Sequence, residues 1–573
     1  MAAEIWMLQT KRADFNEMAE LHHISPVTAR IIRNRDVSGP DAVEKYLRGG
    51  LDDLYSPCLL KDMDRAVLIL KEKIKQLKPI RIVGDYDIDG VCSTYLLYQA
   101  FKETGAVVDY EIPDRIKDGY GINESIIRAA YDDGIDTIVT CDNGIAAVEQ
   151  IKLAKDLGMT VIVTDHHDIG KEEGKEVLPP GDAIVNPKQE ACMYPFPEIC
   201  GGMVAFKLVQ ALYEAFGISK EKWLDMVEFA AIATVGDVMK LQDENRIIVK
   251  EGLKCIGNTK SLGLLKLIEK NNLDKDHITA YQIGFVIGPC LNAGGRLVTA
   301  KLALSLLLCQ EEEEADRMAV ELKDLNDQRK DMTKAGTDEA VKLVEEHFYR
   351  DKVLVVYLPD CHESLAGIIA GRLRERFQKP AFVLTDGEEY VKGSGRSIES
   401  YHMFDALMEV KDLLLKFGGH PMAAGLSLLK ENVDEFRRAL NEHADLTEED
   451  FVKKVWIDVP MPLEYISEPL IEELDLLEPY GQGNEKPLFA QKDLSIRSVR
   501  VLGKNRNVVK FSLATKAGTP MDGLLFEDGD LFVEELGDSR QLDVVYYPAV
   551  NEYNGNKSLQ IIIKNYRILS SSR

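Results

Sequence analysis

Short apolar runs alternate with stretches of helical periodicity in two regions of the chain. In the first region, three apolar runs of strand length lie at 79–83, 137–140 and 160–163. Amphipathic stretches of helix length follow the first two, at 91–102 and 145–157. Strands that alternate with helices of this length predict a parallel sheet covered by helices on both faces. A similar strand–helix–strand region begins at 353–358 and continues to about residue 440.

The remaining regions have other patterns. Helices are predicted for the N-terminal 75 residues and again from about 202 to 347, where 311–346 forms one long charged helix. From residue 451 onward the chain has short β runs between Gly and Asn turns, at 494–502, 508–514, 523–525, 542–547 and 559–563. Such a series of short strands predicts a small closed barrel. We therefore expect a helical region, an α/β domain, a connecting helix, a second α/β domain and a barrel, at 1–75, 76–310, 311–350, 351–450 and 451–573.

Composition restricts the class of protein. The chain has 573 residues, of which 45% are apolar and 29% are charged, as in ordinary globular proteins. No run approaches the roughly 18 consecutive apolar residues of a membrane helix, and the N-terminus lacks the basic head and apolar core of a secretory signal. The nine cysteines include no CxxC pair, which favours reduced thiols over disulfides or a zinc ribbon. We expect a cytoplasmic, multidomain protein without a membrane segment.

Charge is distributed unevenly along the chain. Lys and Arg total 70 and Asp and Glu total 96, so the net charge of −26 is unfavourable for a protein that coats DNA with its whole surface. Residues 491–520, however, contain seven Lys or Arg and one Asp. Arg500, Lys504 and Arg506 lie in the predicted hairpin of this segment, and small barrels bind oligonucleotides on such surfaces. The alternative is that these residues protect an exposed sheet edge from aggregation.

Candidate functional side chains of the first α/β region are predicted to gather at one sheet edge. They follow the three apolar runs and the apolar segment 229–236, and they are Asp85, Asp87, Asp89, Asp142, Asp165, His166, His167 and Asp237. Parallel sheets bind ligands beyond the carboxyl ends of their strands, so these side chains are expected to meet. Without cations, so many charges would repel one another strongly. Carboxylate and imidazole ligands without thiolates favour Mn²⁺ or Mg²⁺ over structural zinc, and more than four ligands indicate two ions.

Each motif alone has a simpler interpretation. Asp before Gly at a strand end is often part of a turn, and Asn-Gly is a common turn dipeptide. An isolated His pair often serves as a cap or a structural hydrogen-bonding group. Successive strand ends that all carry acids are difficult to assign to turns, so a metal site is the preferred interpretation.

Taken in order, the motifs resemble those of a known family. The DHH phosphoesterase superfamily has motifs similar to GDYDIDG, CDNG, TDHH and VGDV. Its RecJ type, the 5′-to-3′ exonucleases specific for single-stranded DNA, has strings that look like IPDRIKDGYGI, IGPCLNAGGRL, FGGHPMAAGL, LEPYGQGN and YNGNKSLQIII. The resemblance covers about residues 50–573. It implies a parallel-sheet DHH domain, a DHH-associated second α/β domain joined to it by the long helix, and a C-terminal OB-type barrel.

The resemblance also implies a metal centre and its catalytic residues. The ligands would be Asp87, Asp89, Asp142, His166 and Asp237, and Asp85 belongs to the same motif. Asp142 would bridge two Mn²⁺ or Mg²⁺ ions. Asp165 would orient His166, and His167 would contact the scissile phosphate or the attacking water. The catalytic set would then be Asp165, His167 and Arg296.

Substrate contacts are implied in the same way. Ser394 and Arg396 would hold a terminal 5′-phosphate, and a planar guanidinium suits that role because it binds phosphate with two hydrogen bonds. Further contacts would come from Arg115, Asn292, Gly419 and His420. Two positions depart from the family pattern: Val83 stands where some relatives have His, and Cys290 stands where the family often has Arg.

The expected activity is metal-dependent removal of nucleotides from the 5′ end of single-stranded DNA, in recombination and repair. A single-strand-binding protein and a helicase are candidate partners, and a monomer is expected. One alternative is a DHH enzyme for oligoribonucleotides or cyclic dinucleotides, although such short substrates need no barrel. Another is a non-catalytic DNA-binding scaffold in replication, although all four acidic motifs are intact.

Overall fold

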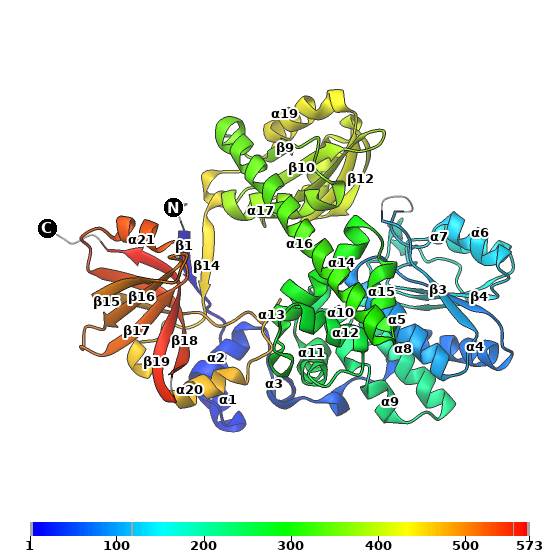
Figure 1. Cartoon of the computed structure of the whole chain (residues 1–573), viewed down its shortest axis with the longest axis horizontal. Helices are drawn as coiled ribbons and strands as arrows, with labels where there is room; N and C mark the ends of the chain where they lie inside the picture. Colours follow the sequence, from blue (N-terminus) through cyan, green and yellow to red (C-terminus); the bar gives the residue numbers. More distant parts are fainter. Residues whose placement is uncertain (1–3, 116–118, 554, 570–573) are drawn as a thin grey trace. The chain divides into compact units, whose positions relative to one another are not determined.

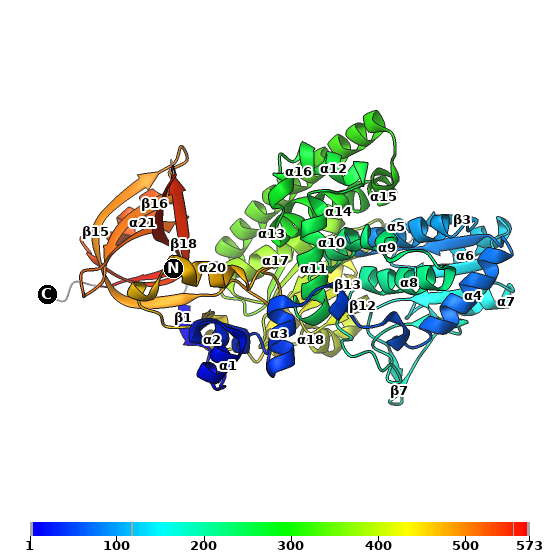
Figure 2. The same ribbon diagram turned by 90° about the horizontal axis from the view of Figure 1, so that it is seen from below.

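The computed structural model describes residues 4–115, 119–553 and 555–569, which form two compact units (Figures 1 and 2). The smaller unit contains the N-terminal residues up to Trp6, with Ala293–Thr299 and Arg317–Val455. The larger unit contains Met7–Asn292, Ala300–Asp316 and the chain from Trp456 onward. None of the helices within the described ranges combines the length and the hydropathy needed to cross a membrane.

The larger unit contains the predicted parallel sheet. Its five strands, in spatial order, are β3 (Val108–Glu111), β2 (Ile80–Val83), β4 (Thr137–Cys141), β5 (Thr160–Thr164) and β8 (Ala183–Val185). All four pairings between them are parallel. The three predicted strands occupy the centre, where both faces are largely buried, and their residues are apolar or Thr apart from the half-buried Arg81 of β2. The parallel-sheet prediction is confirmed, with two additional edge strands.

Helices cover both faces of this sheet. One face packs against α6 (Glu124–Asp132) and α7 (Val148–Asp156). The other face packs against α4 (Met63–Lys75), α5 (Ile88–Glu103) and α8 (Gly201–Phe216). Beyond α8 the chain continues through α9 (Lys220–Leu224), α10 (Val227–Gly236), α11 (Asp243–Ile256), α12 (Leu262–Lys270), α13 (Ala280–Gln282), the π-helix η4 (Ile283–Ile287), α14 (Gly288–Leu297) and α15 (Lys301–Leu308).

The N-terminal region is helical with one exception. Its helices are α1 (Phe15–His22), α2 (Pro26–Asn34) and α3 (Pro40–Arg48). The prediction of helix throughout 1–75 is wrong for β1 (Glu4–Leu8), which pairs with β14 (Lys453–Ile457). This pairing joins segments far apart in sequence, and local periodicity does not reveal such a partner.

The C-terminal segment forms the predicted barrel, drawn in orange and red in Figure 1. Its closed order is β15 (Phe489–Leu502), β16 (Val508–Ala514), β17 (Pro520–Leu525), β19 (Asn556–Ile568) and β18 (Gln541–Tyr553). Helix α20 (Glu468–Asp475) precedes the barrel, and α21 (Gly529–Leu536) lies between β17 and β18. One apolar core runs through the N-terminal helices, α20 and the barrel.

Two buried arginines attach the barrel linker to the rest of the larger unit. Arg35 forms a two-point ion pair with Asp458, at 2.7 and 3.1 Å. Arg246, only 1% exposed, donates to the backbone carbonyls of Leu476, Leu477 and Glu478 at 2.8–2.9 Å. Charged side chains are rarely buried unless they are paired, and these contacts hold the start of the barrel against α2 and α11.

The smaller unit is a second α/β structure. Its sheet has the order β12 (Leu414–His420), β13 (Ala423–Leu428), β11 (Val391–Arg396), β10 (Ala381–Asp386) and β9 (Leu354–Tyr357). Only β9 and β10 are parallel, so the sheet is mixed. Its helices are α17 (Ala366–Phe377), α18 (Met403–Glu409) and α19 (Val433–His443). The long helix α16 (Glu312–Leu343) enters this unit and ends in the π-helix η5 (Val344–Phe348).

Candidate active site

The predicted acids and imidazoles gather at one edge of the parallel sheet. Every one of them belongs to the larger unit and follows β2, β4, β5 or α10: Asp85, Asp87, Asp89, Asp142, Asp165, His166, His167 and Asp237. The carboxylates of Asp85, Asp89 and Asp142 are at most 2% exposed. Ionised groups are seldom buried in this way without a counter-charge. The site is therefore built for positively charged ligands.

Three overlapping groups have ligand atoms within 4.8 Å of one another. The groups are Asp85–Asp87–Asp142, Asp89–His166–Asp237 and Asp142–His166–His167. The first two share no residue, but they are adjacent because His166 Nε2 lies 3.2 Å from Asp142 Oδ1. Two neighbouring oxygen-rich ligand sets with Asp142 between them match a pair of hard divalent cations.

Helix N-termini hold two of the acids. The carboxylate of Asp89 accepts hydrogen bonds of 2.7 and 2.6 Å from the backbone N–H groups of Gly201 and Gly202, where α8 begins. A Cβ added at Gly201 would lie 2.6 Å from the Cβ of Asp142, so the close approach of α8 requires glycine. Asp87 caps α5, because its Oδ1 accepts from the N–H groups of Asp89 and Gly90. Helix N-termini also favour negative charge.

The turn after β4 places Asp142 at the centre of the site. Asp142 has a φ of 60°, in the left-handed region that Asp and Asn tolerate better than most residues. The buried side chain of Asn143 fixes this turn: its Nδ2 donates to the carbonyl of Val83 and its Oδ1 accepts from the N–H of Ile122. The CDNG motif is therefore a turn as well as a ligand, and both interpretations of the motif apply.

Asp165 organises the histidine pair in a way that differs from the prediction. It was expected to orient the His166 ring, but its Oδ1 accepts from the backbone N–H of His166 and from the ring Nδ1 of His167, at 2.7 and 2.8 Å. None of the described residues forms a hydrogen bond with the buried Nδ1 of His166. Asp165 thus positions His167 directly and His166 only through the backbone.

Electrostatic shifts reflect the crowding of acids. Burial, reinforced by the charge of Asp87, raises the pKa of Asp85 to about 8. Burial and the charges of Asp89 and Asp87 raise the pKa of Asp237 to about 8 and that of Asp142 well above its usual value. Burial opposes a charge on His167, but the hydrogen bond to Asp165 and the negative charges of the surrounding carboxylates together outweigh it and raise the pKa of His167 to about 9. Strong shifts of this kind concentrate at functional sites.

The donor set fits divalent cations. Three buried atoms of the site, Asp85 Oδ1, Asp142 Oδ1 and His166 Nδ1, have no hydrogen-bond partner within the part of the chain that the structure describes. Unsatisfied buried oxygen atoms cost free energy unless a ligand contacts them. No cysteine belongs to the three ligand groups, which agrees with Mn²⁺ or Mg²⁺ rather than structural zinc.

Tyr120 also belongs to this site, although the sequence pattern did not single it out. Its hydroxyl donates to the carbonyl of Asp142 at 2.9 Å and lies 3.1 Å from His167 Nδ1. The ring of Tyr120 packs edge-on against Tyr86, and the Arg115 guanidinium lies 4.8 Å from the centre of the Tyr86 ring. The signal in the sequence is the string DGYG, which contributed only to the family resemblance. The predicted contact residue Arg115 is therefore connected to the metal site by the packed rings of Tyr86 and Tyr120.

A second group of predicted residues meets in the smaller unit, where α17 begins. Arg396 Nη1 lies 3.2 Å from Ser394 Oγ, and both residues are on β11. A Cβ added at Gly367, in the first turn of α17, would lie 2.8 Å from Ser394 Oγ and 2.9 Å from Arg396 Nη2. Arg296 donates to the carbonyl of Ser364, just before the same helix. Two guanidinium groups, a hydroxyl and a helix N-terminus form an anion-binding arrangement.

The predicted Gly419 and His420 lie two strands away on the same sheet. His420 and Arg396 are both opposite Ala423 of β13, so their side chains share one face. Gly419 has a φ of 151°, and a Cβ there would lie 2.4 Å from the carbonyl oxygen of Ala423, so glycine is required. Asn292, on α14, belongs to the larger unit, and no residue in the described ranges forms a hydrogen bond with its buried Oδ1.

The two departures from the family pattern are both buried. Val83 ends β2 and is fully buried, so it serves the core of the sheet. Cys290 is also fully buried, with its Sγ 3.7 Å from Asn271 Oδ1. Neither side chain is exposed at the protein surface.

The basic hairpin of the barrel is partly neutralised. Arg506 forms a two-point ion pair with Asp530, and its Nε lies 2.7 Å from the carboxylate. Arg500 and Lys504 are exposed, and Arg500 is opposite Lys510, which pairs with Asp522. Like charges opposite each other are unfavourable without an anionic ligand, so Arg500 is the stronger candidate for phosphate binding.

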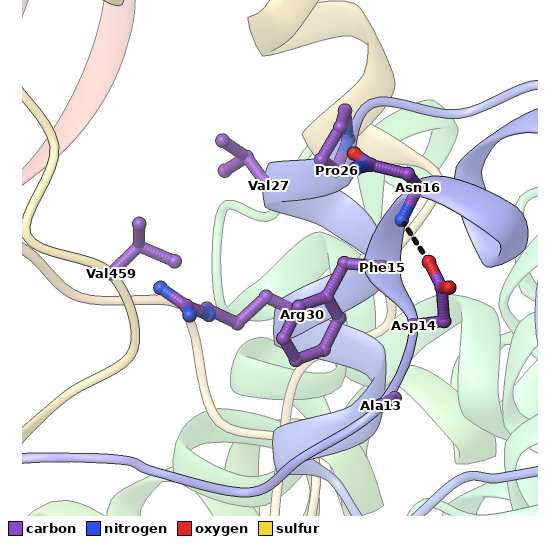
Figure 3. A pocket seen from close by; sticks show the side chains of 8 residues that line it. All are labelled: Ala13, Asp14, Phe15, Asn16, Pro26, Val27, Arg30 and Val459. Atoms are coloured by element: carbon purple, nitrogen blue, oxygen red, sulfur yellow. Dashed lines mark hydrogen bonds between the residues drawn. The ribbon is translucent and has the colours of Figure 1, made fainter.

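A separate hollow lies among the N-terminal helices (Figure 3). It has a volume of about 620 Å³, and Phe15, Arg30 and Val459 are among its lining residues. Two of its polar side chains interact within the protein: Arg30 stacks on Phe15 at 5.0 Å, and Asp14 caps α1. No predicted site residue lines it, so it is not part of the candidate active site.

Three family models match this chain. They are the DHH family, N-terminal domain, at residues 79–236, the DHHA1 domain at 350–445, and the RecJ OB domain at 457–565. The first match ends one residue before Asp237. The three matches fall on the parallel sheet, the mixed sheet and the barrel.

Curated relatives and a solved structure give the same result. The single-stranded-DNA-specific exonuclease RecJ of Bacillus subtilis is 38% identical over 98% of this chain and 70% of its own length. The protein of the same name from Haemophilus influenzae is 33% identical over 94% of this chain and 95% of its own length. The crystal structure of RecJ from Thermus thermophilus in complex with Mn²⁺ matches with a TM-score of 0.84 and 29% identity, and covers 99% of this chain and 80% of that one.

Proposed function

Because this chain belongs to the RecJ family, we propose that it is a metal-dependent exonuclease that hydrolyses single-stranded DNA from the 5′ end, in recombination and repair. The observation that carries the proposal is the pair of adjacent ligand sets at the sheet edge, with Asp142 between them. The relatives from Bacillus subtilis and Haemophilus influenzae are both named as exonucleases specific for single-stranded DNA. The barrel supports an extended substrate rather than a dinucleotide.

Two divalent cations, Mn²⁺ or Mg²⁺, would be held by Asp87, Asp89, Asp142, His166 and Asp237, with Asp85 beside them. When bound, they supply Lewis-acid stabilisation of the phosphate and activation of water for in-line attack. The protein supplies the rest. In the metal-free protein the pKa of His167 is raised to about 9, and the ring is placed where it would donate to a phosphate oxygen as negative charge develops. Asp165 and Tyr120 hold that ring in place.

The polarity of cleavage would come from the anion site of the smaller unit. Ser394, Arg396, Arg296 and the first turn of α17 would bind a terminal 5′-phosphate. His420 shares the face of the sheet that carries Arg396 and would contact the following nucleotide. A monomer, a cytoplasmic location, and association with a single-strand-binding protein and a helicase complete the proposal and rest on the family resemblance.

The test uses purified protein with Mn²⁺ or Mg²⁺ and one oligonucleotide in several forms. Single strands labelled at the 3′ end should shorten progressively, whereas a blocked 5′ end or a duplex should resist. Rapid hydrolysis of dinucleotides with intact long strands would favour the alternative of a small-substrate DHH enzyme. Binding without hydrolysis in either metal would favour a DNA-binding scaffold.

A further inference from the structure

Two exposed aromatic side chains lie on a helix that packs against the metal centre. Tyr281 is 67% exposed and Phe285 is 65% exposed. Their rings stack on each other, with centroids 4.6 Å apart and planes 24° from parallel. Large aromatic groups are usually buried, so a stacked pair that faces solvent indicates a ligand.

The helix that carries the pair is in contact with the metal-binding segments. A Cβ added at Gly288 would lie 3.1 Å from Ile88, the residue between Asp87 and Asp89. A Cβ added at Gly284 would lie 3.6 Å from Val235, two residues before Asp237. Ile283 and Ile287 are fully buried, so the opposite face of the helix carries the aromatic pair. The position of the pair is therefore fixed relative to both ligand sets.

The face that carries the pair becomes partly buried as it continues toward another predicted substrate residue. Tyr281, Phe285, Pro289 and Asn292 follow one another at helical spacings of four, four and three residues, through η4 and into α14. The buried Oδ1 of Asn292 has no hydrogen-bond partner among the described residues, which independently indicates a ligand at this point. The π-helical turn of η4 lies within this stripe, and π-helical turns are frequent at functional sites.

We propose that this stripe is a binding track for single-stranded DNA, on which bases stack against Tyr281 and Phe285 while Asn292 contacts the same strand. The inference rests on the proposed function, because single-stranded DNA is the substrate. Every base has a π-face, so aromatic stacking binds a strand without regard to its sequence, as an exonuclease requires. A duplex cannot use the track, since its bases are already stacked on one another.

The experiment compares binding of an ordinary and a partly abasic oligonucleotide. All proteins carry Asp142→Asn, so that the DNA stays intact, which a gel verifies after each titration. The double variant Tyr281→Ala, Phe285→Ala should bind an ordinary single strand at least about fivefold more weakly than its parent. On a strand with abasic sites after its first nucleotide, parent and variant should bind equally.

Three controls distinguish base stacking from a general loss of affinity, misfolding or self-association. Tyr131→Ala removes an aromatic ring of similar exposure from α6 and should leave binding unchanged. The double variant Tyr281→Trp, Phe285→Trp keeps the stacking surface and should restore affinity. Circular dichroism and light scattering of each variant should show the fold and the mass of the parent.

Equal affinity of the parent and the alanine variant for ordinary DNA would overturn the proposal that this stripe binds single-stranded DNA. So would an equal loss on abasic DNA, or a change in mass, which would show that the pair joins two copies of the chain. Failure of the parent itself to bind single strands would instead contradict the proposed function.

Discussion

The two α/β sheets of this protein carry opposite charges at their candidate sites. The parallel sheet gathers buried acids at its edge, with Asp142 at the centre. The mixed sheet places Ser394 and Arg396 beside the first turn of α17. The sign of the charge indicates the ligand in each case: the acids require cations, and the guanidinium groups require an anion. Metal and phosphate are thus assigned to different sheets, and each assignment can be tested without the other.

The two sites also differ in the free energy that their ligands must offset. Burial, reinforced by the charges of neighbouring acids, raises the pKa values of Asp142 and Asp237, so the metal-free centre is unfavourable by itself. The anion site has partners within the protein, since Arg396 also donates to the carbonyl of Gly395. Removing a ligand should therefore affect the parallel sheet strongly and the mixed sheet weakly.

The largest effect is expected for the metal centre. Asp142→Asn should lower the rate of cleavage by about a thousandfold or more, since it removes charge from the residue shared by both ligand sets, a loss of about 4 kcal/mol in transition-state stabilisation. Asn tolerates the positive φ at this position, so the fold should be retained. Cleavage and strand binding are measured separately. Asp109→Asn, in the same sheet but paired with Arg81, is the control and should remain active. Near-normal cleavage by Asp142→Asn in saturating Mn²⁺ would show that Asp142 is not an essential ligand of the metal centre.

A smaller effect is expected for the anion site. Arg396→Ala should reduce the preference for 5′-phosphorylated over 5′-hydroxyl strands by about ten- to a hundredfold, because a hydrogen bond to a charged group contributes about 1.5–3 kcal/mol. The ratio of kcat/KM values for the two strands measures this effect. Arg374→Ala, on an exposed part of α17, should leave the ratio unchanged. If the activity on both strands falls by the same factor, Arg396 does not recognise the terminal phosphate.

The backbone of α17 offers a second way to test the same site. Gly367→Ala introduces a methyl group 2.8–2.9 Å from Ser394 Oγ and Arg396 Nη2, where the phosphate would bind. It should lower the preference for a 5′-phosphate in the same direction as Arg396→Ala. Gly371→Ala, one turn later, has only a 3.9 Å contact with Arg396 and is the matched control. Equal behaviour of the two glycine variants would contradict the role of the α17 N-terminus.

The pH dependence of metal binding should further distinguish the acidic site of the parallel sheet from the anion site of the mixed sheet. Asp85 and Asp237 have pKa values raised to about 8 in the metal-free protein, so the folded state holds protons between pH 4 and 8 that the unfolded state has released. Stability of the metal-free protein should therefore fall as the pH rises through this range. Mn²⁺ must displace these protons, so its affinity should rise toward pH 8, by at most about tenfold per pH unit for each proton. Calorimetry in buffers of different ionisation enthalpy measures the protons released. An affinity independent of pH would contradict the shifts.

The smallest effect is expected at the barrel. Arg500→Ala with Lys504→Ala should lower the salt slope of single-strand binding by about 0.7 for each lost phosphate contact. Arg506→Ala should change the slope little, because Asp530 already neutralises Arg506. Binding of a long oligonucleotide at several salt concentrations measures both. An unchanged slope in the double variant would indicate that these residues protect a sheet edge from aggregation and do not bind phosphate.

The sequence predicted those elements whose signals are local. The central strands β2, β4 and β5 are mostly apolar because both faces are largely buried, and their ends carry the acids. The edge strands β3 and β8 were not predicted, because β3 is half polar and β8 has only three residues. The strands of the barrel were predicted from their turns, although β15 and β18 extend well beyond the predicted runs.

The candidate site, like the fold, was predictable from the sequence only where its signals are local. The acidic edge followed from the topology of a parallel sheet, so its composition could be derived from the order of motifs alone. Tyr120, the first turn of α17 and the link from Asp165 to His167 depend on contacts between distant segments, which no periodicity encodes. The roles of Ser394 and Arg396 came from the family resemblance, because a Ser and an Arg on one strand are common in any protein.

The double use of Asp89 affects how this family can diverge. Its carboxylate belongs to a ligand set, and it also accepts the first two N–H groups of α8, a buried helix of 16 residues. A descendant that no longer hydrolyses DNA could lose Asp142 or Asp237 at little cost to its fold. Loss of Asp89 would leave two buried N–H groups without an acceptor and lower the free energy of unfolding. Selection for folding alone should therefore preserve Asp89, and its presence in a distant relative is weak support for retained catalysis.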